Sequence, residues 1–435
     1  MMNPDAILQE ISQHMSSGGR VCIAYSGGLD STVLLHLVSQ SHFADRAFAF
    51  HINHQLSAHS DDWEKHCSDT AKVFGVMFES QKVIVASTGK GVEQDAREKR
   101  YVALSSALGT NDLLLFAHHQ NDVTETFMFR VMRGAGLTGL QAIPRVRSLD
   151  SGKGNLLRPL LGCTRVELLQ YAEDKELAWV DDESNEDTRF DRNFLRHELF
   201  PVLSSRWNNA EEKIGQSVAH LSEASALLDE YGKQDLDLCE CKRERLGESI
   251  SIERMAAFSE ARQKHIIRVW CQGQGYSLPG RAQLAKLSEV LHARADAQPK
   301  LQWGRCALRR YGGRLYLSPL IDILGRKGMS LALNQRVHIG ENGEYVHCSA
   351  SAPGEVSQPL SLRFRSGQER CQPKGRAHSQ TLKKLLQEYR LEPWFRDMVP
   401  LIYLGDELVA VGDLFVCDSS AHLPPDFSVS WALSP

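Results

Sequence analysis

Cysteine pairs at the spacing of a metal-binding CxxC motif are missing from this 435-residue chain, although it contains ten cysteines. No CxxC motif occurs anywhere, so the sequence gives no indication of a zinc or iron–sulfur site. The closest pair is Cys239 and Cys241. We expect reduced, mostly buried thiols, and a metal or redox role for this pair is the weaker alternative.

Long apolar runs are also missing. The longest candidate, residues 33–38, is interrupted by His36 and is far shorter than the roughly 20 residues of a membrane-spanning helix. The first twenty residues contain Asp5 and Glu10 and lack the apolar core of a secretory signal. We therefore expect a soluble, cytosolic protein without a membrane segment. Its 42% hydrophobic and 24% charged residues are typical of globular domains.

A strong excess of charge of one sign is the third missing feature. The formal net charge of −4 predicts no overall attraction to nucleic acid, so any RNA-binding surface must be local. The length favours two to three domains. No internal repeat and no low-complexity tract occurs.

The N-terminal half alternates short β-rich runs with stretches of helical apolar spacing. The predicted strands are residues 21–25, 47–52, 77–85 and 112–117, and the predicted helices are 31–39, 61–74, 93–108 and 122–132. This alternation predicts an α/β fold with a doubly wound parallel sheet. Such sheets bind ligands beyond the carboxyl ends of their strands, so the loops after the strands are the places to search.

Three domains are expected. Residues 1–207 form the α/β domain, and residues 208–340 form a mainly helical domain that is rich in Glu, Lys and Leu. Residues 341–435 begin with a Gly/Ser/Pro-containing stretch, 341–359, whose composition favours an exposed linker. A small α+β module follows it.

The loop after the first strand carries the strongest motif, Ser-Gly-Gly-Leu-Asp-Ser-Thr at residues 26–32. Glycines let the backbone turn tightly, and the helix that follows offers unpaired N–H groups to an anion. The loop therefore predicts phosphate binding, whereas a lone Gly-rich turn would predict no ligand. It is not a Walker loop, because the G-x-x-x-x-G-K-[ST] pattern is absent.

This motif resembles the pyrophosphate-binding loop of the PP-loop ATP-pyrophosphatase superfamily, whose members form adenylated intermediates. Further motifs follow in order: His51-Ile52-Asn53-His54, Arg97 to Tyr101, Ala117 to Thr126, Arg133 to Gly136, Arg158-Pro159-Leu160-Leu161, Asp181 to Asn185 and Arg192 to Arg196. The series resembles the tRNA(Ile)-lysidine synthetases. C-terminal segments around residues 364–365, 382–388, 393–397 and 400–403 extend the likeness to the long form of that family.

The resemblance implies that ATP and Mg²⁺ bind at the loop after the first strand, with Asp30 as the metal ligand. The residues implied to bind ATP are Ser26, Gly27, Gly28, Leu29, Asp30, Ser31, His51, His54 and His118. A zinc site built from His51, His54, His118 and His119 is the weaker alternative, because no third ligand of matching spacing accompanies either pair.

Lysine is the second implied substrate. Asp122 and Glu125 lie three residues apart at a helix start and share one face, and the resemblance implies that they bind its amino groups, with Arg192 near its carboxylate. Together with Asp30 these are the implied catalytic residues. Ordinary helix-start acids that complement the dipole are the alternative. Asn121 departs from the family, where a second acidic residue is usual.

RNA contacts are implied at two places. Arg97 and Arg100 would border the entrance for the RNA base, with a solvated basic face as the alternative. Residues 359–400 hold nine basic against four acidic residues, a net +5 that includes Lys383, Lys384 and Arg396. Such a patch suits phosphate contacts. The helical and C-terminal domains are therefore expected to bind tRNA.

The implied reaction joins L-lysine to C2 of the wobble cytidine in an isoleucine tRNA with a CAU anticodon, through an adenylated tRNA. A tRNA thiolase is the rival within the superfamily, but those enzymes need cysteine pairs or a persulfide carrier. A non-catalytic tRNA-binding module would require a degenerate phosphate loop, and the loop is intact. The oligomeric state stays open, with a homodimer among the alternatives.

Overall fold

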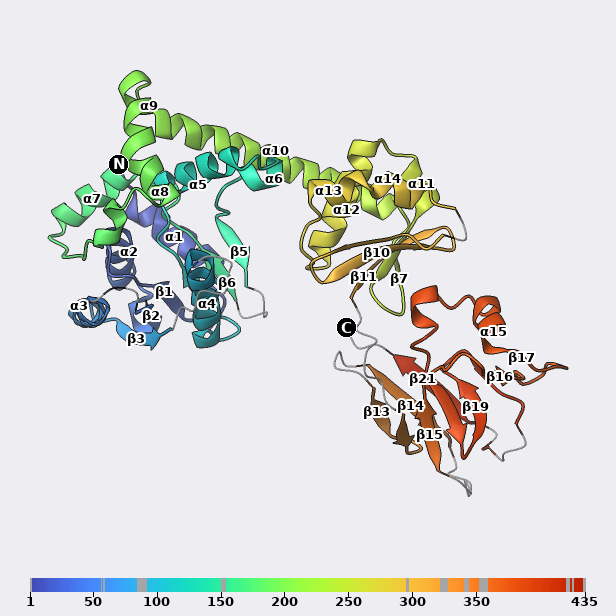
Figure 1. Ribbon diagram of the computed structural model, residues 1–435. Helices are drawn as coiled ribbons and strands as arrows, with labels where there is room; N and C mark the ends of the chain where they lie inside the picture. The colour runs from blue at the N-terminus through green and yellow to red at the C-terminus, as the bar shows by residue number, and fades with distance from the viewer. Residues whose placement is uncertain are drawn as a thin grey trace. The chain divides into compact units, whose positions relative to one another are not determined.

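The computed structural model describes residues 2–55, 57, 59–83, 92–149, 154–294, 297–320, 328–339, 344–351, 359–419, 423–424 and 426–432 (Figure 1). The chain forms two compact units, Met1–Leu227 and Leu228–Pro435. Within the described residues, no helix is both long enough and apolar enough to cross a membrane.

The first unit contains a sheet wrapped by helices. Its strands are β1 (Val21–Ala24), β2 (Ala47–Asn53), β3 (Met77–Lys82), β4 (Leu113–Leu115), β5 (Val146–Ser148) and β6 (Asn155–Leu157). Its α-helices are α1 (Pro4–His14), α2 (Leu29–Ser39), α3 (Ser60–Val73), α4 (Val92–Ala107), α5 (Gln120–Met132), α6 (Leu137–Leu140), α7 (Arg165–Asp174), α8 (Asp191–Phe194), α9 (Phe200–Arg206) and the start of α10 (Ala210–Leu238). Shorter turns are η1 (Ala44–Arg46), η2 (Glu183–Glu186) and the π-helical η3 (Leu195–Leu199).

The sheet has the order β3-β2-β1-β4-β6-β5. All neighbouring strands pair in parallel except β5, which is antiparallel to β6 at the edge. The predicted doubly wound parallel sheet is confirmed. The chain leaves β1 toward β2 on one side, and β4 lies on the other side, so the strand order reverses at β1. The loops after β1 and β4 therefore meet at the switch point where such folds bind ligands.

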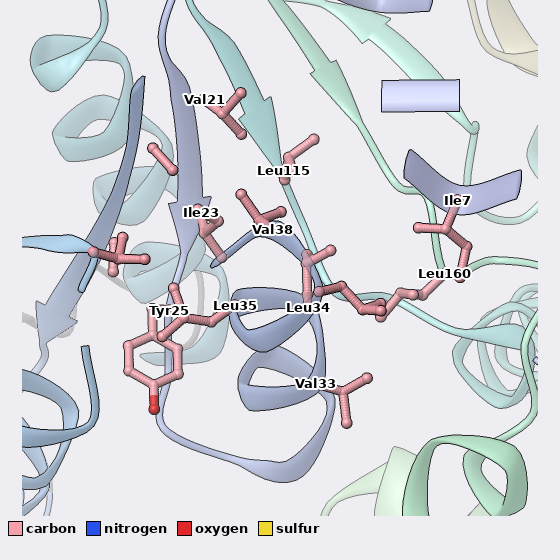
Figure 2. Close-up of a cluster of buried hydrophobic side chains, with 14 of the residues drawn as sticks. Ile7, Val21, Ile23, Tyr25, Val33, Leu34, Leu35, Val38, Leu115 and Leu160 are labelled. Atoms are coloured by element: carbon pink, nitrogen blue, oxygen red, sulfur yellow. The ribbon is translucent and has the colours of Figure 1, made fainter. Parts of the chain in front are cut away.

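Alternate residues of the strands supply two separate cores. On one face, Val21 and Ile23 pack with α1 and α2, as Figure 2 shows for the labelled side chains around Leu34. On the other face, Cys22 packs with Leu104 of α4. Both faces are thus covered, which explains why these strands read as continuous apolar runs. The α2 helix is buried along most of its length, which fixes the loop that precedes it.

The second unit begins inside α10 and continues with helices and a sheet. Its helices are α11 (Ile252–Ala256), α12 (Glu260–Gly273), α13 (Arg281–Ala285) and α14 (Leu287–Leu291), and its strands are β7 (Lys242–Arg243), β8 (Glu248–Ser251), β9 (Lys300–Trp303), β10 (Cys306–Tyr311) and β11 (Arg314–Pro319). These strands form one sheet of order β7-β8-β11-β10-β9. The sequence predicted residues 208–340 to be mainly helical and did not predict this five-stranded sheet, because the short strands alternate with helices whose spacing dominated the pattern.

The C-terminal part of this unit contains two larger sheets. Their strands are β12 (Met329–Leu331), β13 (Arg336–His338), β14 (Tyr345–Ser349), β15 (Leu360–Arg363), β18 (Leu401–Leu404), β19 (Glu407–Val411), β20 (Phe415–Val416) and β21 (Ser428–Ala432). The remaining elements are the pair β16 (Arg370–Cys371) and β17 (Gln380–Thr381), the helix α15 (Leu382–Glu388) and the turn η4 (Pro393–Phe395).

Two expectations about this part need correction. The stretch 341–359 is not an exposed linker where the structure describes it, because β14 pairs with β13 and β21 and its Val346 and Cys348 are buried. Composition averaged over the stretch concealed the alternating burial of five strand residues. The C-terminal β-region also starts before residue 341, because β12 already pairs with β15.

Candidate active site

The loop after β1 turns sharply at Gly27 and then enters α2. Gly27 has φ of +85°, and a Cβ at this position would lie 2.7 Å from Sγ of Cys67, so both conformation and space require glycine. The hydroxyls of Ser31 and Thr32 each donate to the carbonyl oxygen of Gly28 at 3.0 Å. These bonds fix the first turn of α2, whose N–H groups are the natural ligands of an anion.

The remaining loop residues reinforce this turn. The hydroxyl oxygens of Ser26 and Ser31 lie 3.0 Å apart, and the N–H of Gly28 donates to Ser26 Oγ at 3.4 Å. Leu29 starts α2 and is buried in the core. The loop is thus held in shape by its own side chains and by the core behind it.

Asp30 follows in the first turn of α2. Its buried Oδ1 has no hydrogen-bond partner among the described residues, and its Oδ2 lies 3.5 Å from Nε2 of His119. A buried carboxylate oxygen without a partner is costly unless a cation or donor binds it. The carboxylate therefore fits a hard cation such as Mg²⁺ beside the phosphate loop.

His119 links the loops after β1 and β4. Its Nε2 lies 3.5 Å from Asp30 and 3.6 Å from Oδ2 of Asp122, and its Nδ1 accepts the N–H of Asn121 at 3.2 Å. When the ring is neutral, its proton is therefore on Nε2, between the two carboxylates. Burial disfavours the imidazolium, but Asp30, Asp122 and Glu125 outweigh it, and the pKa of His119 is raised.

Asp122 closes this arrangement at the start of α5. Its Oδ2 accepts the backbone N–H of His119 at 3.0 Å in a capping box. Burial would raise the pKa of Asp122, but the charges of His119 and His118, that hydrogen bond and Arg192 lower it. Asp122 is thus both a helix cap and an ionised carboxylate in the site, so the two roles weighed for it are compatible.

Glu125 lies one turn further along α5 and is almost fully buried. Arg196 of η3 donates from Nε to Glu125 Oε1 at 2.8 Å, and Arg192 of α8 donates to Thr126 Oγ1 at 3.3 Å. Burial raises the pKa of Glu125 and Arg196 opposes that rise, with a net upward shift. Two arginines thus bring α8 and η3 against α5.

The predicted histidines lie at the same edge of the sheet. His51 Nδ1 lies 2.9 Å from the carbonyl oxygen of Tyr25, and burial lowers the pKa of His51. The buried Nδ1 of His54 has no partner among the described residues, and burial together with Arg100 lowers its pKa to about 4. Both rings are therefore neutral near pH 7 and can take a hydrogen bond from a ligand.

Comparisons with known proteins identify the family. The sequence model of the PP-loop domain matches residues 4–203, that of the TilS substrate binding domain matches residues 250–316, and that of the TilS substrate C-terminal domain matches residues 360–431. A tRNA(Ile)-lysidine synthase of Coxiella burnetii is 38% identical, covering 96% of this chain and 94% of that protein. The chain belongs to the tRNA(Ile)-lysidine synthase family.

Further relatives support this membership. A tRNA(Ile)-lysidine synthase of Serratia proteamaculans is 37% identical, covering 99% of each chain. Among solved structures, a U34-tRNA thiolase of Methanococcus maripaludis is similar over 50% of this chain and 80% of its own, with 14% identity and a TM-score of 0.40. Likeness at that level adds nothing to the family assignment.

Asn121, where this chain departs from the acidic residue usual in the family, has its side chain bonded outside the carboxylate cluster. Its side-chain amide donates to Glu211 of α10, and its Oδ1 accepts the N–H of Arg165 at 3.0 Å. Asn121 therefore joins α5 to α7 and α10. The assignment of the functional carboxylate to Asp122 rather than to position 121 is consistent with this geometry.

His118 points differently from its neighbour His119. Arg158 donates from Nε to His118 Nδ1 at 3.2 Å and from a terminal nitrogen to the carbonyl oxygen of Pro144 at 2.6 Å. Arg158 is itself buried. The residues predicted to bind ATP included His118 but not His119, which was named only among the loop histidines, although a histidine three residues before an acid at a helix start is a capping pattern that indicates a fixed side chain.

The implied RNA contacts are brought together only in part. Arg100 is exposed on α4 and is close enough to influence His54, whereas the side chain of Arg97 lies outside the described part. Lys383 and Lys384 are exposed on α15. Arg396 instead donates to the carbonyl oxygen of Leu391 at 3.0 Å, so it belongs to the fold of the C-terminal part.

The net +5 of residues 359–400 is also weaker at the surface than the sequence suggested. Three of its arginines pair with acids in the structure: Arg363 with Asp406, Arg365 with Asp397, and Arg376 with Glu388. Asp406 lies outside the counted stretch. These ion pairs neutralise part of the basic surface. The exposed lysines of α15 and their neighbours remain as its cationic residues.

Proposed function

We propose that this chain ligates L-lysine to C2 of the wobble cytidine of an isoleucine tRNA with a CAU anticodon, with ATP as cosubstrate. The observation that carries the proposal is the convergence of the phosphate-binding loop with Asp30, His119 and Asp122 at the switch point of the sheet. The family membership supplies the substrates. The product is lysidine, which changes codon reading from AUG to AUA.

The first step activates the base. The C2 carbonyl oxygen of the cytidine attacks the α-phosphorus of ATP, an O–P bond forms, and pyrophosphate leaves. The loop of Ser26 to Ser31 would hold the pyrophosphate, while His51, His54 and His118 would border the nucleotide. Asp30 would hold Mg²⁺, which neutralises charge on the leaving pyrophosphate.

The second step joins lysine to the base. The lysine amine attacks C2, a C–N bond forms, the C–O bond to the adenylate breaks, and AMP leaves with that electron pair as the amine gives up a proton. Asp122 and Glu125 would bind the amino groups and Arg192 the carboxylate. Arg196 keeps the buried Glu125 carboxylate paired, which favours its charged form.

The decisive experiment incubates the protein with labelled lysine, ATP and CAU-anticodon isoleucine tRNA, followed by digestion to nucleosides. We expect labelled lysidine with one AMP and one pyrophosphate per product. A sulfur-containing nucleoside in the presence of a sulfur donor would favour the thiolase instead. RNA binding without pyrophosphate release would favour the non-catalytic module.

Two further assignments accompany this function. A tRNA-modifying ligase of this family would work in the cytosol, where its tRNA, ATP and lysine occur. A homodimer stays a prediction, and light scattering of the purified chain would test it.

A further inference from the structure

A cavity of about 310 Å³ opens in the second unit, whereas the phosphate loop belongs to the first. Its lining residues are Arg310, Tyr311, Gly312, Gly313 and Arg390. Arg310 and Tyr311 end β10, Gly312 and Gly313 form the turn into β11, and Arg390 follows α15. Two of the five are cationic and none is acidic, so the lining suits an anion.

Arg390 occupies a backbone position that favours glycine. Its φ is +55°, and the chain around it ends α15 with hydrogen bonds from Arg390 N to Gln387 O and from Leu391 N to Leu386 O, both at 3.0 Å. Glycine is the usual residue at such a helix end, and a larger residue in this conformation costs stability. An arginine is therefore less favourable than glycine for the backbone at this position. What it adds is a guanidinium side chain that lines the cavity.

The glycine pair leaves the opposite side of the cavity open. Gly312 and Gly313 have φ of +55° and +76°, and they join Tyr311 to its paired residue Arg314 in a two-residue hairpin turn. A Cβ added at either glycine would meet no atom within 4 Å. Their backbone is therefore directly accessible to a ligand.

The polar groups of the lining are held in place by neighbours. Arg310 donates to the carbonyl oxygen of Ala293, and Arg396 donates to the phenolic oxygen of Tyr311 at 3.4 Å. Because that oxygen accepts from Arg396, the Tyr311 hydroxyl can donate its own proton to a ligand. A fixed guanidinium and a directed hydroxyl are suited to recognise an anion with several oxygens.

We propose that this cavity binds a phosphate of the RNA backbone, with Arg310 and Arg390 on its oxygens and Tyr311 donating a hydrogen bond. The inference rests on the proposed function, which supplies an RNA substrate. Phosphates carry the oxygen geometry that guanidinium groups prefer, and most contacts of a protein with a nucleic acid go to its backbone. The site would position the tRNA without reading its sequence.

Arg390→Gly is the sharpest test, because it removes the guanidinium and relieves the backbone at once. Binding of CAU-anticodon isoleucine tRNA to the full chain is measured at several salt concentrations. We expect a several-fold loss of affinity, a salt slope that is smaller by up to about 0.9, and a thermal midpoint that is unchanged or higher. Arg390→Lys should retain most of the affinity.

A second variant tests the cavity independently of Arg390. Gly312→Asp keeps a residue that tolerates positive φ and adds a carboxylate beside the bound phosphate, so tRNA affinity should fall further than with Arg390→Gly. Arg281→Ala is the matched control, because Arg281 is exposed on α13 and does not line the cavity. With saturating tRNA, Arg281→Ala should release pyrophosphate at the wild-type maximal rate.

The outcomes separate cleanly. Affinity and salt slope equal to those of Arg281→Ala in both cavity variants would overturn the proposal. Calorimetry with inorganic phosphate or ATP gives a second outcome that would overturn the proposal. If Arg390→Gly abolishes binding of these anions but leaves tRNA binding unchanged, the cavity holds a free anion and not an RNA phosphate. If the wild-type chain makes no lysidine but Arg390→Gly still weakens tRNA binding, the proposed reaction fails and the phosphate site stands.

Discussion

Arg196 Nε lies 2.8 Å from Oε1 of Glu125, and the side chain of Glu125 is only 3% exposed. The two residues are 71 positions apart in the sequence. Their ion pair attaches the segment of α8 and η3 to helix α5. A mutation of either residue therefore tests both the stability of the unit and the binding of lysine.

Arg196→Ala should lower the free energy of unfolding by roughly 3 kcal/mol, because it leaves a buried carboxylate without its partner. Denaturant unfolding measures the change. Adding Glu125→Gln to this variant should recover part of the loss, since it removes the unpaired charge. Arg189→Ala is the control: the side chain of Arg189, which pairs with Asp187, is 88% exposed, so a much smaller loss is expected. Equal losses in both variants would contradict the role of the pair.

His119 should make the stability depend on pH above neutrality. Its pKa is raised in the folded state, so its contribution is complete below its unfolded pKa of about 6.5 and is lost as pH rises through the folded pKa. The difference in unfolding free energy between the wild type and His119→Gln should therefore shrink from pH 6 to pH 9. The same substitution at exposed His42 is the control. A constant difference for His119 would contradict its charged contact with Asp30 and Asp122.

Asp30→Ala should abolish pyrophosphate release while tRNA affinity stays within a few-fold, because the loop handles phosphate and metal rather than the RNA backbone. Pyrophosphate release and tRNA titration measure the two effects separately. Asp45→Ala, at an exposed acid in η1, should leave both unchanged. Wild-type turnover of Asp30→Ala would remove Asp30 from the mechanism.

Asp122→Ala or Glu125→Ala should raise the lysine concentration needed or stop the second step, while adenylated tRNA still forms. The reason is that removing a carboxylate weakens the binding of a cationic amine. Single-turnover assays with and without lysine distinguish the two steps. If both variants use lysine normally, these residues are only helix-start acids that stabilise α5.

Lys383→Ala with Lys384→Ala should weaken tRNA binding and reduce the slope of log affinity against log salt by up to about 0.9 for each lost phosphate contact. ATP affinity should hardly change, because the phosphate loop lies in the other unit. This pair is preferable to a deletion after residue 341, which would leave β12 without β15. An unaltered slope would mean that the lysines of α15 are solvated surface.

Local sequence was sufficient for the parts of the site that depend on local geometry. The motif at residues 26–32 follows an apolar strand and starts a helix, so chain geometry alone predicts a turn that needs Gly27 and an anion site at the start of α2. Asp122 and Glu125 are three residues apart on a helix, so their shared face followed from helical periodicity. The parallel order of the sheet then placed both segments at one edge.

The tertiary structure decided which neighbouring residues serve the site. His118 and His119 are adjacent and chemically identical, and only the capping geometry of α5 directs His119 to Asp30 while Arg158 takes His118. The sequence predicted Arg396 as a surface cation that contacts RNA. In the structure its side chain donates a hydrogen bond to the carbonyl oxygen of Leu391. In each case the partner that fixes the side chain is set by backbone geometry or by residues distant in the sequence, and neither composition nor periodicity carries that information.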